Sequence, residues 1–249
     1  MCGRFSFSPN EILIEERFDL EVEEGSYTPR YNCAPSQNLA VVSNHDPGKL
    51  SYFRWGLIPF WARDPAIGNR MINARAEGIL EKPSFRNPFR QRRCLVLSDG
   101  FFEWKRTSVS SQQSAACPDE RSEIRIGSLK EAGDGRQKAG GKVPYRIVMK
   151  NGDLFAMAGI WDAWKDADGS IIRSFAIITT TPNELMSPIH DRMPVILPRR
   201  FEKEWLTSDR TGDLTRLLEP YPSEEMEAYP VSWLVNNPAN DNPAVIARR

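Results

Sequence analysis

The pattern of apolar positions along the chain predicts a fold made mostly of strands. Short runs rich in β-branched and aromatic residues recur between Gly and Pro turns, and few of them repeat with a helical period. We expect strands over 51–59, 93–98, 100–105, 143–149, 154–161, 174–180 and 193–197. No long helical segment separates these strands, so antiparallel pairing is expected. The predicted fold class is α+β, a single compact domain (1–249) with a mostly antiparallel β-barrel-like core and short flanking helices.

Helix signals are fewer and occur at four places. Ser8 is expected to cap the first helix, with Pro9 in its first turn and Glu11 completing a capping box. This acidic amphipathic helix is expected to continue to residue 24 and to end in a turn at Gly25. Three further short helices are expected, one opening at 181–184 and two over 201–206 and 214–218.

The segment 107–141 differs in composition from the rest of the chain. It contains no aromatic residue and is rich in Ser, Gly and Gln, so it cannot bury much apolar surface. We expect a flexible insertion between two strands, with Cys117 as an exposed and inert thiol. Composition leaves open whether this insertion binds anything.

Composition excludes several classes of protein. The 249 residues carry 33 basic and 33 acidic side chains, which argues against a surface that attracts nucleic acid everywhere but permits a local basic groove. No apolar stretch approaches the roughly 18 residues that span a bilayer, and the first residues lack the apolar core of a secretory signal. Four cysteines without a CxxC pair and two histidines predict no metal and no cofactor. We therefore expect a cytoplasmic protein with free thiols.

Positive charge is concentrated in residues 50–106. This stretch holds eleven Lys and Arg against five Asp and Glu, interleaved with Trp and Phe. Such interleaving suits single-stranded nucleic acid, because cations neutralise phosphates while aromatic rings stack on bases. An ordinary cationic face beside core aromatics would have the same composition.

Cys2 is the most informative single position. Aminopeptidases remove Met1 when the next side chain is small, which would leave Cys2 at the N-terminus. An N-terminal cysteine has a free α-amine, with a pKa of about 7.7–8.0, next to its thiol. The amine can form a Schiff base with an aldehyde, and the thiol can then close a thiazolidine ring. The alternative is that cysteine occupies this position by chance.

Glu103, His190 and the pair Asn73 and Arg75 could also take part in chemistry. Each has a functional interpretation and a purely structural one. Glu103 lies among aromatic residues, where a carboxyl has a raised pKa, or it is a solvated strand carboxylate. His190 is a general acid or base in a Pro-bounded loop, or a loop histidine bonded to backbone. Asn73 and Arg75 would face the same side of an extended segment and hold a sugar-phosphate, or they are a turn amide and a surface cation.

These residues belong to a series of ordered motifs. The series consists of MCGRF at 1–5, YNCAPSQ at 31–37, WGLIPFW at 55–61, NARAE at 73–77, GFFEW at 100–104 and HDRMPV at 190–195, followed by VS at 231–232, VN at 235–236 and ND at 240–241. On these motifs the chain resembles the SRAP (SOS-response-associated peptidase) family. The resemblance runs from Cys2 to about Ile246 and fails only in the 107–141 insertion.

The resemblance implies a function and a set of site residues. Members of this family recognise abasic sites in single-stranded DNA and form a covalent DNA–protein crosslink during the DNA damage response. By motif matching, the catalytic residues would be Cys2, Asn73, Glu103 and His190. Arg4, Arg75 and Arg86 would contact phosphate, Pro35 and Trp104 would lie at the DNA cleft, and Trp61 would flank the groove.

The expected partner is single-stranded DNA carrying an abasic site, bound by a monomer without metal or membrane and associated with the nucleoid when on DNA. Two alternatives stay open. The first is a cysteine-type autopeptidase that cleaves the Met1–Cys2 bond, as the family name suggests. The second is a non-covalent binder of single strands or junctions, for which Cys2 would be dispensable.

Overall fold

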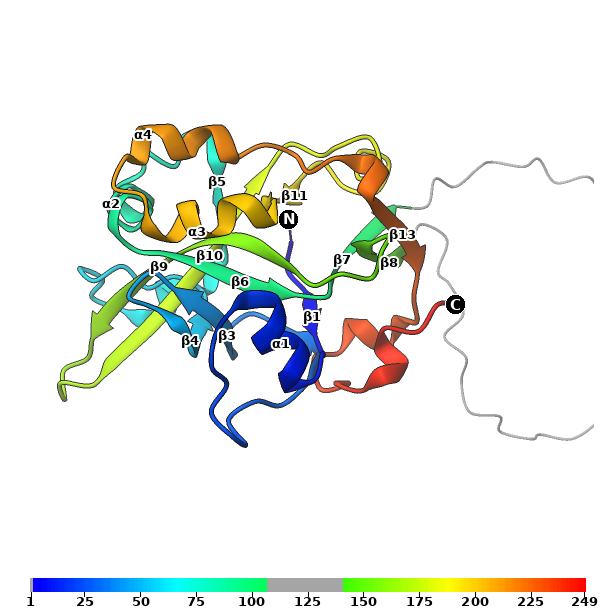
Figure 1. The fold of residues 1–249 in the computed structure, drawn as a ribbon, viewed down its shortest axis with the longest axis horizontal. Coiled ribbons are helices and arrows are strands. Elements are labelled where there is room, and N and C mark those ends of the chain that lie inside the picture. The colour runs from blue at the N-terminus through cyan, green and yellow to red at the C-terminus, as the bar shows by residue number, and fades with distance from the viewer. Residues whose placement is uncertain (1, 107–140) are drawn as a thin grey trace, which may run out of the picture.

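The computed structural model describes residues 2–106 and 141–249 (Figure 1). Five strands close into a barrel in the order β10-β4-β3-β6-β9, because β10 also pairs with β9. These strands are β3 (Asn38–Ser43), β4 (Asp46–Trp55), β6 (Arg93–Ser98), β9 (Phe155–Lys165) and β10 (Ile171–Thr180). Three short strands extend the barrel sheet: β5 (Asn73–Arg75), β11 (Met193–Pro194) and β12 (Ile196–Leu197).

A second, five-stranded sheet lies beside the barrel. Its order is β13-β8-β7-β1-β2, and every pairing in it is antiparallel. The strands are β1 (Phe5–Phe7), β2 (Arg30–Cys33), β7 (Gly100–Arg106), β8 (Lys142–Met149) and β13 (Met226–Pro230). Chain segments from both ends of the sequence therefore meet in this sheet.

The predicted α+β class with a mostly antiparallel, barrel-like core is confirmed. Every predicted strand is present, although the run 193–197 is divided into β11 and β12. Two pairings depart from the prediction, since β10 runs parallel to both β4 and β5. The strand β4 ends at Trp55 because Gly56 adopts φ 127°, and a Cβ there would lie 2.6 Å from the Gly68 carbonyl oxygen.

The first helix is shorter than predicted. Helix α1 spans Glu11–Phe18, and its cap is Asn10, whose side chain accepts from the Leu13 N–H. The capping role predicted for Ser8 is wrong, because the Ser8 N–H and hydroxyl both donate to the Asp99 carboxylate, at 2.9 and 2.6 Å. The predicted continuation to residue 24 is also wrong, since Asp19 takes the left-handed conformation at φ 52° and ends the helix.

The other helices partly follow the prediction. The segment after 181 forms hydrogen-bonded turns instead of a helix, capped by Asn183, whose side chain accepts from the Met186 N–H at 2.9 Å. Helix α3 (Arg199–Thr207) confirms the prediction at 201–206, and α4 (Thr211–Leu214) with a 3-10 turn at Thr215–Leu217 matches 214–218. Helix α2 (Pro83–Gln91) was not predicted. Further 3-10 turns are η1 (Pro65–Arg70), η2 (Ala76–Gly78), η4 (Ser223–Glu225), η5 (Trp233–Asn236) and η6 (Pro243–Val245).

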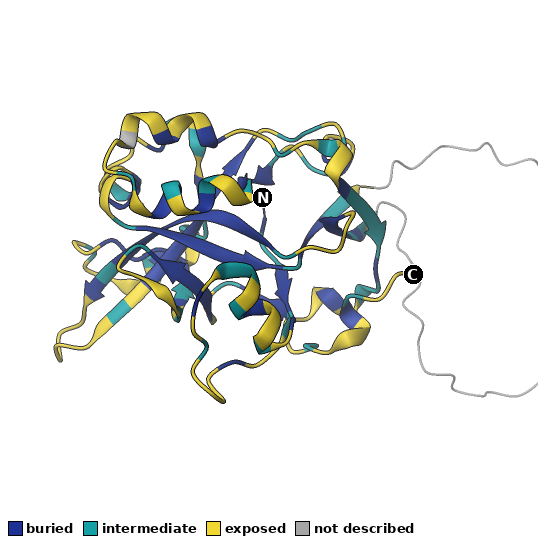
Figure 2. Ribbon diagram, in the orientation of Figure 1, coloured by how far each residue is buried: buried dark blue, intermediate teal, exposed yellow. Residues whose placement is uncertain are grey.

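The core fills the barrel and the junction between the two sheets. Strands β6 and β9 are almost continuously buried and β10 is buried from Ser174 to its end, whereas the helices expose one face (Figure 2). Large aromatic side chains dominate this core, among them Trp55, Phe101, Phe175 and Trp205. In the described part of the chain, no helix is long and apolar enough to cross a membrane. The predicted insertion at 107–141, with Cys117, lies outside the described residues except for Gly141.

Candidate functional site

Cys2 lies just before β1, which pairs with β7 of the second sheet, and its carbonyl contacts Asn73 on β5 of the barrel sheet. This N-terminal segment is fixed on both sides. The Phe102 N–H donates to the Arg4 carbonyl at 2.9 Å, and the Asn73 side-chain amide donates to the Cys2 carbonyl at 2.8 Å. The Cys2 side chain is fully buried, and this burial raises the pKa of its thiol. Cys2 is therefore held as a protonated thiol at neutral pH.

Glu103 supplies a buried carboxyl beside this thiol. It stands on β7 opposite Tyr145 and is only 2% exposed. Burial raises its pKa to about 7, and its negative charge in turn raises the pKa of the Cys2 thiol. A carboxyl with this pKa populates both protonation states near neutrality, as a group that moves protons requires.

His190 faces Glu103 from a loop between β10 and β11. Its Nε2 lies 3.7 Å from the Glu103 Oε2, within ion-pair range but too far for a direct hydrogen bond. Its Nδ1 accepts from the Arg192 N–H at 3.1 Å and lies 2.9 Å from the Asp191 carboxylate. Burial lowers the pKa of His190, so the neutral imidazole is favoured.

Asn73 and Arg75 lie on the short strand β5, parallel to β10. Ala74 between them is buried, so the two side chains point to the same side, as an extended segment predicts. Asn73 contacts Cys2, and its Oδ1 is buried without a hydrogen-bond partner among the described residues. That oxygen is an acceptor available to a bound group, while Arg75 is exposed beside it.

Arg4 and Trp104 are both tied to the C-terminal segment. The Arg4 Nη1 donates to the Asn32 Oδ1 and to the Val235 carbonyl, each at 2.8 Å, and burial lowers the Arg4 pKa. The Trp104 indole N–H donates to the Asn236 side chain at 2.8 Å. The segment around 235–236 therefore fixes the orientation of two side chains that are neighbours in sequence of the central residues.

A buried amide explains why the motifs at 31–37 and 235–241 occur together. Asn32 is fully buried, and its Nδ2 donates to the carbonyls of Asn237 and Asn240 at 3.0 and 2.8 Å. The Asp241 carboxylate accepts from the Tyr31 and Asn32 N–H groups. These contacts hold the C-terminal segment against β2. Sequence analysis identified both motifs but assigned no role to Asn32 or Asp241, because the partners of each lie some 200 positions away.

The remaining predicted DNA contacts lie further out. Pro35 is half-buried, Trp61 is 49% exposed in the loop after β4, and Arg86 is exposed on α2, which packs on β6 and β9. Among the described residues, no hydrogen bond or ion pair joins these three to the four central side chains. The structure thus brings Cys2, Asn73, Glu103 and His190 together, with Arg75 on the same strand as Asn73.

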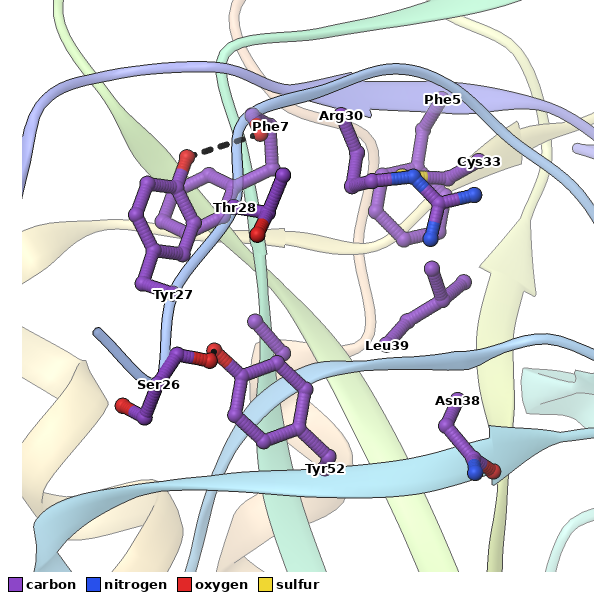
Figure 3. Close-up of a pocket in the computed structure, with 11 residues that line it drawn as sticks. Phe5, Phe7, Ser26, Tyr27, Thr28, Arg30, Cys33, Asn38, Leu39 and Tyr52 are labelled. Carbon is purple, nitrogen blue, oxygen red and sulfur yellow. Dashed lines mark hydrogen bonds between the residues drawn. The ribbon is translucent and has the colours of Figure 1, made fainter. Parts of the chain in front are cut away.

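A separate cavity of about 210 Å³ lies behind β1 (Figure 3). Phe5, Tyr27, Leu39 and Tyr52 line it, and the Tyr27 hydroxyl donates to the Phe7 carbonyl at 2.9 Å. Cys33 also lines the cavity, and burial raises the pKa of its thiol. None of the four central side chains lines this cavity, so it is distinct from the site at Cys2. Within the described ranges, no cluster of His, Cys, Asp and Glu has an arrangement that would hold a metal ion.

Comparison with known proteins shows to which family the chain belongs. A sequence model of the family described as SOS response associated peptidase (SRAP) matches residues 1–238. The abasic site processing protein YoqW of Bacillus subtilis is 44% identical over 99% of both chains, and the abasic site processing protein HMCES of Mus musculus is 30% identical over 99% of this chain and 76% of its own length. A solved structure from Bacteroides thetaiotaomicron, 29% identical, superposes over the whole of both chains with a TM-score of 0.79. The chain therefore belongs to the SRAP family.

Proposed function

We propose that this protein recognises abasic sites in single-stranded DNA and forms a covalent thiazolidine crosslink through Cys2 after Met1 is removed. Met1 itself lies outside the described residues. The observation that carries the proposal is the fixed backbone of Cys2 beside the buried Glu103, which the half-buried His190 faces. The names of the relatives YoqW and HMCES support abasic sites as the lesion.

The first step joins the Cys2 amine to the C1′ aldehyde of the open abasic sugar. The hydrogen bond from Asn73 and the pairing of Arg4 with Phe102 fix the direction in which the Cys2 backbone enters the site. Alignment of this kind supplies effective molarities of about 10⁵ M or more. The free Asn73 Oδ1 is placed to accept from a sugar hydroxyl or from the amine.

Proton transfers at the sugar and the amine fall to Glu103 and His190. As the sugar opens, the proton of its C1′ hydroxyl passes to Glu103 while His190 protonates the ring oxygen, and His190 then recovers a proton from Glu103. During imine formation Glu103 moves the two protons of the attacking amine to the aldehyde oxygen, which leaves as water. Loss of one water gives an imine between the Cys2 nitrogen and C1′. A carboxyl with a pKa of about 7 serves both directions of this transfer.

Ring closure uses the Cys2 sulfur. The thiol adds across the imine, so that a bond forms between Sγ and C1′ and the thiol proton passes to the nitrogen. The raised pKa of the buried thiol keeps it protonated until the imine forms.

DNA binding is assigned to the cations and aromatics around the site. Arg75 is exposed on the same side of β5 as Asn73 and is placed to contact a phosphate next to the abasic sugar. We assign further phosphate contacts to Arg4 and Arg86, and base contacts at the cleft to Pro35, Trp61 and Trp104.

A denaturing gel tests the proposal. Mature protein is mixed with single-stranded DNA carrying one abasic site, beside Cys2→Ala, a form that retains Met1, and Cys94→Ala. Cys94 is a matched control because it is equally buried but lies in the barrel. A stable shifted band made only by wild type and Cys94→Ala supports the crosslink.

Three other results would count against the proposal. An adduct of undiminished yield and stability in Cys2→Ala would exclude the thiazolidine. Reversible, salt-sensitive binding without any band would favour a non-covalent binder, and turnover of peptides would favour a peptidase.

A further inference from the structure

Glu77 belongs to the 73–77 motif but has no part in the mechanism above. It lies in η2, directly after β5, and its carboxylate binds the Arg192 guanidinium with both oxygens, at 2.5 and 2.9 Å. The two partners differ in exposure, because the Glu77 side chain is 53% exposed and the Arg192 side chain only 11%. The hydrogen bond from Arg192 lowers the pKa of Glu77, which keeps the carboxylate charged.

This ion pair joins two parts of the site that are distant in sequence. On one side is the β5–η2 segment, which carries Asn73. On the other is the loop that carries His190, two residues before Arg192. The Arg192 Nη2 also donates to the Thr179 carbonyl at 2.5 Å, so the guanidinium is held by both β10 and η2.

The backbone of Arg192 makes the contact that matters for His190. Its N–H donates to Nδ1 at 3.1 Å, which requires a lone pair on Nδ1 and therefore puts the proton of the neutral ring on Nε2. Nε2 is the nitrogen that faces Glu103, at 3.7 Å. The Asp191 carboxylate, 2.9 Å from Nδ1, acts in the opposite sense because it favours a proton on Nδ1. Asp191 is 88% exposed, so solvent screens its charge.

We propose that Glu77 is a positioning residue, which holds Arg192 so that the Arg192 N–H keeps His190 in the tautomer with its proton directed at Glu103. The proposal rests on the proposed function for its consequence in crosslinking, but the tautomer can be measured without any DNA. A bidentate, charge-assisted pair fixes a guanidinium in both distance and plane. Without it, Arg192 loses its anionic partner, and the backbone that follows His190 is no longer fixed from η2.

The test compares Glu77→Ala, Glu77→Gln and Glu81→Ala. Glu81 is the matched control, since it is an exposed carboxylate four positions away that makes no ion pair within the described ranges. Glu77→Gln keeps an acceptor for Arg192 without the charge. Arg192→Lys should disrupt the same contact from the other side, because an ammonium cannot bind both oxygens of the Glu77 carboxylate in the plane of a guanidinium.

The first measurement is the tautomer of His190 by NMR of ring-labelled histidine. The chain has two histidines, and the exposed His45 serves as an internal reference. We expect the Nε2–H form to dominate in wild type and Glu81→Ala, and a mixture of tautomers in Glu77→Ala, Glu77→Gln and Arg192→Lys. The His45 signals stay unchanged in all of them.

The second measurement is the crosslinking rate at saturating DNA, with DNA affinity measured separately. For Glu77→Ala we expect a rate at least about tenfold lower, since a misplacement of about 1 Å can cost about a hundredfold, and an affinity within about twofold of wild type. Glu77→Gln, which keeps one acceptor for Arg192, should lose less of the rate than Glu77→Ala. If wild type itself forms no adduct, the proposed function fails while the tautomer result still stands.

Two results would overturn the proposal. One is an unchanged His190 tautomer and an unchanged rate in Glu77→Ala. The other is tighter DNA binding by Glu77→Ala without loss of rate, which would show that Glu77 withholds Arg192 from the DNA instead of positioning His190.

Discussion

Replacement of Glu103 by Gln should change the pH dependence of stability in a way that follows from its burial. The carboxyl is 2% exposed, and burial raises its pKa from 4.5 to about 7. The folded protein therefore keeps a proton that the unfolded chain has already released. The stability that this group contributes is fully present below pH 4.5 and is lost as the pH rises to about 7.

The size of the effect follows from the same shift. Each pKa unit corresponds to about 1.4 kcal/mol, and over the interval from pH 5 to pH 8 linkage gives a loss of about 2.5 kcal/mol. Glu103→Gln has no ionisation at this position and avoids that loss. Relative to wild type, the variant should therefore gain about 2.5 kcal/mol of unfolding free energy between pH 5 and pH 8.

Urea unfolding at the two pH values measures this difference directly. Comparing each variant with itself across pH cancels any effect of the substitution that does not depend on pH. Glu81→Gln, which alters an exposed carboxylate, is the control and should show almost no change. A relative gain below about 1 kcal/mol for Glu103→Gln would refute the raised pKa, and with it the role of Glu103 in moving protons near neutrality.

Three further predictions concern the groups around the site. Asp191→Asn removes the negative charge 2.9 Å from the His190 Nδ1, so the His190 pKa should fall further; an NMR titration that shows it unchanged or raised would contradict this. Arg75→Ala should weaken binding to abasic single-stranded DNA and reduce the salt dependence of log K by about 0.7, the value for one phosphate contact, and an unchanged slope would remove Arg75 from the phosphate contacts. Asn236→Ala removes the 2.8 Å hydrogen bond to the Trp104 indole and should weaken DNA binding about twofold to fivefold, as measured by fluorescence anisotropy. Trp104→Phe, which keeps a ring but has no N–H, should lose a similar amount, and normal binding by both variants would show that the orientation of the indole is unimportant.

The barrel strands could be predicted because their sequences carry the signal of full burial. β6 and β9 are apolar almost throughout, and such runs leave little choice of structure. The strands β1 and β2 gave no comparable signal, since they have three and four residues. Their pairing depends on β7, whose position in the fold no local pattern reveals.

The error at the first helix has a specific cause. Ser8 fits the pattern of a helix cap, but its N–H and hydroxyl are taken by Asp99, 91 positions along the chain. Asn10 caps the helix instead. Capping rules describe local competition for N–H groups, and a distant carboxylate changes the outcome.

The central site residues could be named from motifs, but their arrangement could not. The sequence does not show that Glu103 and His190 face one another at 3.7 Å, or that Asn73 holds the Cys2 carbonyl. It also gave no role to Glu77, although this residue stands in a motif. Its function in the structure depends entirely on Arg192, which a separate part of the chain supplies.

The most direct test of the central claim is the intact mass of the purified adduct before and after treatment with borohydride. A thiazolidine and an imine have the same mass, but only the imine is reduced and gains two hydrogens. The account predicts an adduct that contains the chain without Met1, equals the sum of protein and abasic DNA less one water, resists reduction and maps to Cys2. An adduct of the wild-type protein that takes up two hydrogens, or that maps to another residue, would contradict it.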